Sequence, residues 1–249
     1  MFRGKASSQI TGSDINDTAM IFGGIQKNSL IDYPGKISCV LFLSGCNFAC
    51  PYCHNPDLAK NNPSVFLKEN EIYTFLESRR GFLDGVVISG GEPTLCDDIE
   101  SVCRKIKAVG YPVKLDTNGS SPPVIKNLID EGLVDYIAMD IKTDPALYPF
   151  FVKYGCESAD ILSSIQAIMN SAIDYEFRTT CVRPFISQPV IGKISGIIKG
   201  AGLYVLQRFQ NKNVLDPDFF AAEDCGFSED ELLELQTAAE PFVGKCIIR

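Results

Sequence analysis

The stretch from Ser44 to Asn55 reads SGCNFACPYCHN and places three cysteines, Cys46, Cys50 and Cys53, within eight residues. The whole chain has 249 residues and ten cysteines, so this stretch is a local concentration of thiols. The surrounding glycine, asparagine and proline are typical of a loop, which argues against three ordinary core cysteines. Three side chains on one compact loop can converge on one metal centre. The stretch therefore predicts a thiolate metal site.

Two kinds of metal site fit this spacing. A structural zinc site usually has four ligands in two separated pairs, and the fourth ligand here would be His54, the only histidine in the chain. That residue adjoins Cys53, and neighbouring side chains point apart, so such a site would be strained. A cubane iron–sulfur cluster has four irons, so three cysteines would leave one iron open for a substrate. The spacing favours the cluster and leaves zinc as the alternative.

The other seven cysteines are scattered along the chain, at Cys39, Cys96, Cys103, Cys156, Cys181, Cys225 and Cys246. Cys39, Cys103 and Cys181 fall within expected strands or helices, where a thiol is usually a small core residue. No second close group of cysteines occurs in the sequence. We therefore expect one cluster only.

Around the cysteine loop, apolar β-branched runs alternate with helical patterns. The runs predict six strands, at Ile37–Leu43, Gly85–Ser89, Pro112–Thr117, Asp135–Lys142, Tyr175–Val182 and Leu203–Phe209. The helical patterns fall at about Lys68–Arg80, Asp97–Gly110, Pro122–Gly132, Asp160–Asn170, Pro189–Lys199 and Ser228–Phe242, with Asp97 and Ser228 as expected N-caps. Alternation of this kind predicts an α/β fold with a parallel sheet. The sheet is either an open doubly wound one or a barrel with fewer than eight strands.

Both architectures place ligands at the carboxyl ends of the strands. The unusual polar residues do follow or close the strands: Cys46–Cys53 the first, Ser89–Thr94 (SGGEPT) the second, Asp116–Gly119 (DTNG) the third and Met139–Lys142 (MDIK) the fourth. Arg178 lies within the fifth strand, and Gln207 and Arg208 lie within the sixth. One face of the sheet therefore collects thiols, carboxylates, basic groups and glycine turns, as an active site would.

Charge and hydropathy exclude several classes. The chain has 23 basic and 31 acidic residues, a net charge of −8, which argues against a nucleic-acid surface. No run of about eighteen apolar residues suggests a membrane span. Residues 1–20 lack the hydrophobic core of a signal peptide and look like a poorly ordered leader before a single domain at 21–249 with a helical tail. Ten cysteines without a secretory signal predict a cytoplasmic protein.

The Cys-x3-Cys-x2-Cys loop and the later Gly-Gly-Glu-Pro turn together resemble the radical S-adenosylmethionine (SAM) enzymes. The resemblance covers roughly Gly23 to Phe209. With SLIDYPGK, CPYCHNP, DTNG and MDIK, the chain is similar to the glycyl-radical-enzyme activases. Within them, residues 23–59 look most like the activating proteins of anaerobic ribonucleoside-triphosphate reductases, relatives of the pyruvate formate-lyase activating enzymes. The resemblance implies a partial (β/α)6 TIM-like barrel.

The resemblance also implies the chemistry. A [4Fe-4S] cluster on the three cysteines would bind SAM through its open iron and reduce it to methionine and a 5′-deoxyadenosyl radical. That radical would remove a hydrogen atom from a backbone glycine of a partner, here an anaerobic ribonucleoside-triphosphate reductase. The electron would come from a flavodoxin-type or ferredoxin-type donor. Two rivals are an activase for a pyruvate formate-lyase type enzyme and a radical SAM enzyme for a small molecule, such as deazaguanine synthesis. Non-catalytic rivals are an iron–sulfur electron carrier and a zinc-binding interaction module.

Site residues follow from the resemblance by matching positions. It implies Cys46, Cys50 and Cys53 as cluster ligands, Tyr52, Cys53 and His54 on the adenine side, Gly90, Gly91 and Glu92 at the SAM amino group, Lys142 and Arg178 at its carboxylate, and Asp116, Thr117, Asp140 and the Ala138 carbonyl around a small monovalent cation. One departure stands out, because the formate-lyase relative has a histidine on its last strand. Gln207 or Arg208 would have to cover that position.

Overall fold

The structure, a computed structural model, describes residues 22–221 and 225–249. The expected leader at 1–20 lies outside these ranges. The described residues form one sheet of eight strands in sequential order: β1 Phe22–Ser29, β2 Ser38–Leu43, β3 Gly85–Gly90, β4 Val113–Thr117, β5 Tyr136–Asp140, β6 Asp174–Cys181, β7 Tyr204–Arg208 and β8 Cys246–Ile248. The helices are α1 Pro56–Ala59, α2 Glu69–Ser78, α3 Ile99–Val109, α4 Pro122–Asp130, α5 Ser158–Met169, α6 Gln188–Ile197 and α7 Glu229–Ala239.

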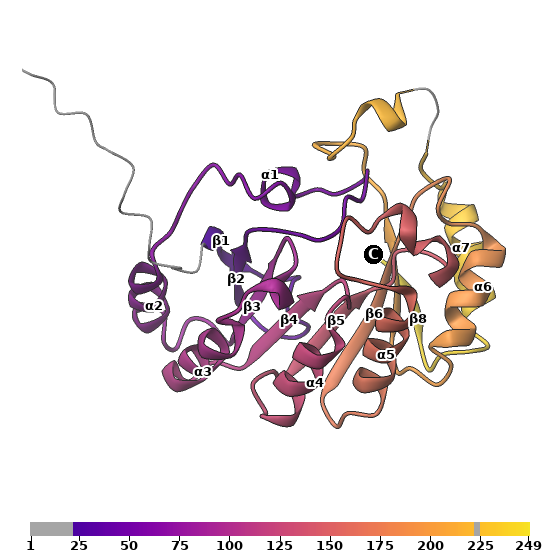
Figure 1. Cartoon of the computed structure of the whole chain (residues 1–249). Coiled ribbons are helices and arrows are strands. Elements are labelled where there is room, and N and C mark those ends of the chain that lie inside the picture. Colours follow the sequence, from indigo (N-terminus) through magenta and orange to yellow (C-terminus); the bar gives the residue numbers. More distant parts are fainter. Residues whose placement is uncertain (1–21, 222–224) are drawn as a thin grey trace, which may run out of the picture.

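Strands β2 to β7 are parallel, and a helix follows each of them (Figure 1). These are the six strands and six main helices predicted from the sequence, with ends within three residues, so the α/β fold and its (β/α)6 repeat are confirmed. Two strands were missed. β1 pairs antiparallel with β2, and the three-residue β8 pairs parallel with β7. The sheet order runs from β1 to β8 without pairing these two, which leaves the barrel partial.

Helix ends illustrate how local sequence sets the elements. The α7 cap is as predicted, because the Ser228 hydroxyl accepts a bond from the Glu231 amide and the Glu231 carboxylate accepts from the Ser228 amide. The α3 cap was wrong by one residue. Asp98 is the N-cap, and its side chain makes no capping bond. The other end of α3 is Gly110, whose φ of 105° suits a residue without a Cβ.

Alternation along the strands separates two layers of side chains. Val113 and Leu115 of β4 belong to the large core under the helices, so Lys114 and Asp116 face the inner side of the curved sheet. On that side, Tyr33, Val40, Val87, Tyr136 and Ala138 form a second, small apolar cluster. Register pairs Lys114 with Tyr136 and Asp116 with Ala138, so these two charged residues lie level with the apolar cluster. Asp140 and Arg178 pair one step nearer the carboxyl ends. The interior therefore carries charged side chains both beside the apolar cluster and above it.

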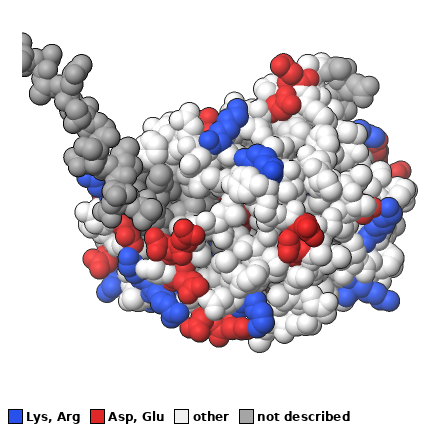
Figure 2. Space-filling model, in the orientation of Figure 1, with Lys and Arg blue, Asp and Glu red and all other residues white. Residues whose placement is uncertain are grey.

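The molecular surface carries mixed charge. In the view of Figure 2, basic and acidic side chains of the described residues interleave along the lower edge, and the centre of this face is largely uncharged. No broad basic patch is visible among the described residues on the face drawn there. Within residues 22–221 and 225–249, none of the helices has the length and apolar character needed to cross a membrane.

Candidate active site

A cavity of about 410 Å³ opens at the carboxyl ends of the parallel strands. Its walls include these predicted site residues: Cys46, Cys50, Tyr52, Cys53, His54, Gly90, Gly91, Asp116, Thr117, Asp140, Lys142 and Arg178. Segments up to 132 residues apart in sequence are thus brought to one place, because the ends of parallel strands share an edge. Of the predicted site residues, Glu92, Ala138 and Arg208 do not line this cavity, and Glu92 lies behind its wall.

The cysteine loop is held by backbone bonds to the segment that follows β5. The Ala49 amide donates to the Phe151 carbonyl (2.7 Å), and the Lys153 amide donates to the Asn47 carbonyl (2.8 Å). The Asn47 side-chain oxygen also accepts a bond from Asn118 (3.1 Å). A loop rich in small and polar residues therefore gains a fixed shape from its neighbours rather than from its own secondary structure.

The donor set fits an iron–sulfur cluster. All three thiols line the same cavity, and no fourth cysteine does so among the described residues. Burial raises the pKa of Cys46 to about 11 and that of Cys50 to about 12, so these groups are neutral until a metal replaces their protons. In the described residues no three Cys, His, Asp or Glu side chains are already gathered for a metal, so loading would draw the thiols inward.

A second observation points to a bound group beside the thiols. Tyr52 lines the cavity, and its hydroxyl is buried and has no hydrogen-bond partner among the described residues. Buried hydroxyls are nearly always paired, so this group suggests a polar atom supplied from outside the chain. An iron–sulfur cluster on the three thiols would supply a single electron and an open iron site.

The glycine turn after β3 touches the cysteine loop. The amides of Gly91 and Glu92 donate to the carbonyls of Leu43 (2.9 Å) and Gly45 (2.8 Å). A Cβ on Gly90 would stand 2.2 Å from the Leu43 carbonyl oxygen, and one on Gly91 would stand 2.0 Å from that of Gly45. Gly90 also has a φ of 123°, which side chains disfavour. The glycines are therefore required for the contact between these two loops, besides any approach to a ligand.

Gly91→Ala is expected to displace the cysteine loop, because its Cβ would overlap the backbone of Gly45. We predict loss of most of the bound iron after anaerobic reconstitution, measured by iron analysis. Gly196→Ala in α6 is the control, since a Cβ there meets nothing within 4 Å and should stabilise the helix by about 0.5–1 kcal/mol. Normal iron content in the Gly91 variant would show that the close contact is not needed for loading.

Glu92 ties two turns together behind the cavity. Its carboxylate accepts bonds from the amide and hydroxyl of Thr94 (3.0 and 2.6 Å), the hydroxyl of Thr117 (2.8 Å) and the amide of Asn118 (2.6 Å). The side chain is 1% exposed, and burial raises its pKa despite these donors. The expected contact between this carboxylate and the SAM ammonium stays a prediction. Its role in the structure is to fix the turns that follow β3 and β4.

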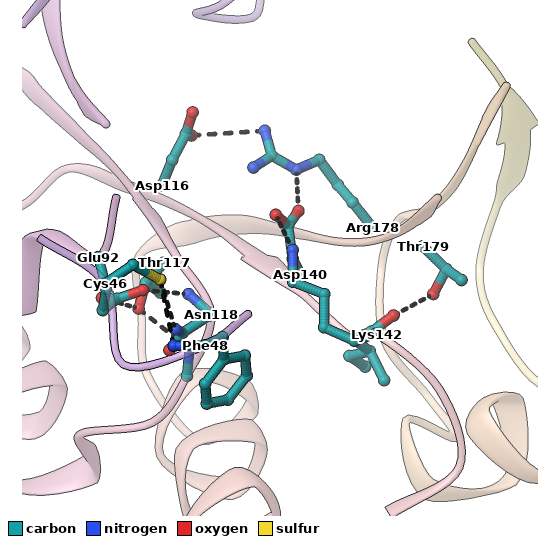
Figure 3. Close-up of polar contacts among 12 residues, drawn as sticks. Cys46, Phe48, Glu92, Asp116, Thr117, Asn118, Asp140, Lys142, Arg178 and Thr179 are labelled. Carbon is teal, nitrogen blue, oxygen red and sulfur yellow. Dashed lines mark hydrogen bonds and ion pairs between the residues drawn. The ribbon is translucent and has the colours of Figure 1, made fainter. Parts of the chain in front are cut away.

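The carboxylates of the cavity are paired with basic groups (Figure 3). Arg178 donates to Asp140 through Nε (2.7 Å) and contacts Asp116 through its Nη1 (3.4 Å). Lys142 also donates to Asp140 (2.9 Å). Burial alone would raise the pKa of Asp140, but the charges of Arg178 and Lys142 outweigh it and hold the pKa below its usual range. Asp140 is therefore an ionised bridge between two cations.

From the sequence, either of two residues could take the place of the last-strand histidine of the formate-lyase relative. Gln207 lines the cavity, whereas Arg208 pairs with Glu229 of α7 and is half exposed. Among these two, only Gln207 can therefore reach a bound ligand. The alternation of the strand could have separated them, because neighbouring residues of β7 face opposite sides.

Several cavity residues were not predicted as site residues. Asp32 lines the wall and accepts a bond from the Ser29 hydroxyl, and Asn55, Asn118 and Phe48 line it as well. Asp32 lies in SLIDYPGK and Asn118 in DTNG, so the signal was present in motifs already recognised. The resemblance assigns a role to only some positions of these motifs, and these residues are not among them.

Comparison with known proteins identifies the class. A family model described as the radical SAM superfamily matches residues 40–184. Among solved structures, Streptococcus suis SuiB bound to its precursor peptide SuiA superposes with a TM-score of 0.64 at 13% identity, over 84% of this chain and 48% of that chain. At that identity the likeness concerns the fold, and this chain spans about half of SuiB. The partial barrel with its three-cysteine cavity thus defines a radical SAM protein.

Relatives in sequence narrow the assignment. A Methanocaldococcus jannaschii protein named "Putative glycyl-radical enzyme activating enzyme" is 37% identical over 234 residues, covering 92% of this chain and 95% of its own length. The pyruvate formate-lyase-activating enzyme of Staphylococcus epidermidis is 35% identical over 129 residues, covering 47% of this chain and 51% of its own. The chain therefore belongs to the glycyl-radical enzyme activating family of the radical SAM superfamily.

Proposed function

We propose that this protein cleaves SAM reductively at a [4Fe-4S] cluster held by Cys46, Cys50 and Cys53. The resulting 5′-deoxyadenosyl radical generates a glycyl radical on a partner enzyme, an anaerobic ribonucleoside-triphosphate reductase. The observation that carries the proposal is the cavity, which sets three thiols opposite a cluster of basic side chains. A flavodoxin-type or ferredoxin-type protein supplies the electron.

The chain's own residues bind and orient the amino-acid end of SAM. Arg178 and Lys142 lie at the cavity wall and both contact Asp140, and Arg178 also contacts Asp116. They are the basic groups at the wall that can also pair with the carboxylate of the ligand. The charge of Asp140 outweighs burial and raises the pKa of Lys142, which keeps its ammonium protonated. The backbone of Gly90 and Gly91 faces the amino group.

The adenine end is placed against the cysteine loop. His54 lines the cavity, and its ring lies 6.3 Å from that of Phe209, while Nδ1 lies 3.2 Å from the Lys212 carbonyl oxygen. Tyr52 packs against Phe151 and Phe185 with ring centroids 6.0 and 5.9 Å away. These aromatic contacts support a loop that keeps water from the sulfonium while the radical forms.

One comparison favours a protein substrate over a small molecule. The relative similar over nearly the whole chain carries the name of an enzyme that activates glycyl-radical enzymes. The choice of a ribonucleotide reductase over a pyruvate formate-lyase type enzyme rests on the resemblance of residues 23–59. The runner-up is therefore an activase for that second type of partner.

The test is anaerobic. Reconstituted protein, SAM, a strong reductant and the reductase from the same organism are mixed, and an electron paramagnetic resonance spectrum is recorded. A glycyl-radical doublet on the reductase supports both the reaction and the partner. 5′-Deoxyadenosine without the doublet keeps the cleavage and rejects this partner. Neither product, from protein with a full cluster, contradicts the proposal.

Lys142→Ala is expected to weaken SAM binding about tenfold or more, because it removes a positive charge that pairs with the SAM carboxylate. The iron content should not change, because the lysine is not a ligand of the cluster. Equilibrium dialysis with labelled SAM and iron analysis measure the two quantities. Lys153→Ala is a control, since that side chain contacts the Ala59 carbonyl (3.4 Å) and does not line the cavity. Equal affinity in both variants would remove Lys142 from the binding site.

A further inference from the structure

A buried lysine lies directly beneath the charged wall of the cavity. Lys114 of β4 is 1% exposed, and its ammonium donates to the carboxylate of Asp116, two residues along the same face of the strand. The neighbouring strand supplies Tyr136, whose ring centroid lies 5.9 Å from Lys114 Nζ. A lysine is almost never buried without a partner, so this ammonium is a component of the site and not a surface charge.

The same carboxylates were expected to hold a small monovalent cation, and the structure disagrees. Asp116 contacts Lys114 and Arg178, and Asp140 contacts Arg178 and Lys142, so both carboxylates already have protein cations. A bare alkali ion needs several oxygen ligands that are free to turn toward it. Here both oxygens of Asp140 and Oδ1 of Asp116 contact nitrogen donors, so Oδ2 of Asp116 is the one carboxylate oxygen of this pair without such a contact among the described residues.

The other two expected ligands are also engaged. The Thr117 hydroxyl donates to Glu92 (2.8 Å), and its oxygen accepts from the Gly119 amide (3.1 Å). Ala138 is fully buried in the middle of β5, which is paired on both sides, so its backbone serves the ladder. The four groups therefore keep few oxygen atoms free for a cation.

Charge balance supports the same conclusion. Lys114, Lys142 and Arg178 carry three positive charges against the two of Asp116 and Asp140. The buried Glu176 on the same face is offset by its partner Arg249, so this network keeps a surplus of one. Another cation would double that surplus in a region of low exposure, where like charges repel strongly. A surplus of one matches a single ligand carboxylate, and this last step alone rests on the proposed function.

We propose that Lys114 is a built-in counter-ion that occupies the place of a free monovalent cation and makes this site independent of Na⁺ and K⁺. It is a positioning residue. Its ammonium holds the Asp116 carboxylate where that group also meets Arg178, and Arg178 in turn meets Asp140. The conformation of the carboxylate-binding wall is then set by the chain alone.

The test uses the full chain with its cluster and without SAM or partner. Thermal unfolding is followed in KCl, NaCl and choline chloride at one ionic strength, since choline is too large to replace an alkali ion. For the natural protein we expect midpoints within about 1 °C of each other. Lys114→Met removes the charge at similar length, and we expect its midpoint in choline chloride to fall by about 10 °C. KCl or NaCl should recover at least half of that loss.

Two further variants separate the cation effect from general damage. Lys114→Met combined with Asp116→Asn removes both charges and is expected to lose the salt-specific recovery. Lys126→Met breaks an exposed pair with Asp130 and should respond equally to all three salts. If Lys114→Met folds only in KCl or NaCl, the proposal is supported. If it folds in none while the double variant folds, the proposal is overturned.

Two other outcomes would also overturn it. One is a rise of several degrees for the natural protein in KCl or NaCl over choline chloride, because that would show an occupied cation site. The other is a Lys114→Met variant that is indifferent to the cation. Because SAM and the partner are absent, either result leaves the proposed reaction untouched, and a missing glycyl radical leaves this inference untouched.

Discussion

Replacing Cys46, Cys50 or Cys53 singly with alanine is expected to abolish the iron–sulfur absorption of the reconstituted protein and all detectable SAM cleavage. The physical reason is the absence of a substitute ligand. No fourth cysteine lines the cavity in the described part of the chain, and His54, which does, is adjacent to Cys53. A cubane left with two protein thiolates has two uncovered irons and should be lost or degraded.

Cys103→Ala is the matched control for this experiment. Cys103 is fully buried in α3 under the sheet, so its removal leaves a small cavity and costs about 1 kcal/mol without touching the cluster. Iron, labile sulfide and the visible spectrum are measured for all four variants, with 5′-deoxyadenosine as the activity readout. A cluster that persists in all three loop variants would exclude the ligand assignment. Loss of the cluster in the Cys103 variant as well would mean that general destabilisation explains the result.

Strand periodicity was sufficient for the repeating part of the fold and insufficient at its edges. Among the six parallel strands, β2, β3 and β5 are largely apolar on both faces, so each stands out as a run. β1, with the sequence FGGIQKNS, has two glycines and an exposed polar centre, and only its pairing with β2 makes it a strand. β8 has three residues, which is below the length at which a pattern exists. Tertiary context decides both.

Site residues that lie in a recognised sequence motif were predictable. Residues whose role depends on which side chains they contact in the fold were less so. The cysteine loop and the ends of the strands were found because parallel topology alone brings them together. Glu92 was assigned to a ligand, since the sequence does not reveal that Thr94, Thr117 and Asn118 converge on it. Lys114 was overlooked as a lysine within an apolar strand. Its spacing of two from Asp116 was a usable signal, because such residues share one face.

Arg178→Met is expected to produce the largest loss among variants of the charged wall, about 3 kcal/mol of unfolding free energy and at least a tenfold loss of SAM affinity. Arg178 is 13% exposed at its side chain and contacts both Asp116 and Asp140. Its removal leaves each carboxylate with one lysine partner. The repulsion between the two carboxylates is then no longer offset by the guanidinium that contacts both. Arg104→Met is the control, because that pair with Glu131 is half exposed and should be worth about 0.5 kcal/mol or less.

A pH series distinguishes this electrostatic role from simple packing. The charges of Arg178 and Lys142 overcome the effect of burial and depress the folded-state pKa of Asp140, so its contribution to stability is complete above the unfolded-state value of about 4 and is lost as the pH falls below it. Without Arg178 the depression is smaller. The stability gap between the natural protein and the variant should therefore be full near pH 7 and should close only as the pH falls well below about 4, through the depressed folded-state pKa of Asp140. A gap independent of pH would assign the loss to packing of the arginine side chain, and a variant as stable as Arg104→Met would remove Arg178 from the centre of the network.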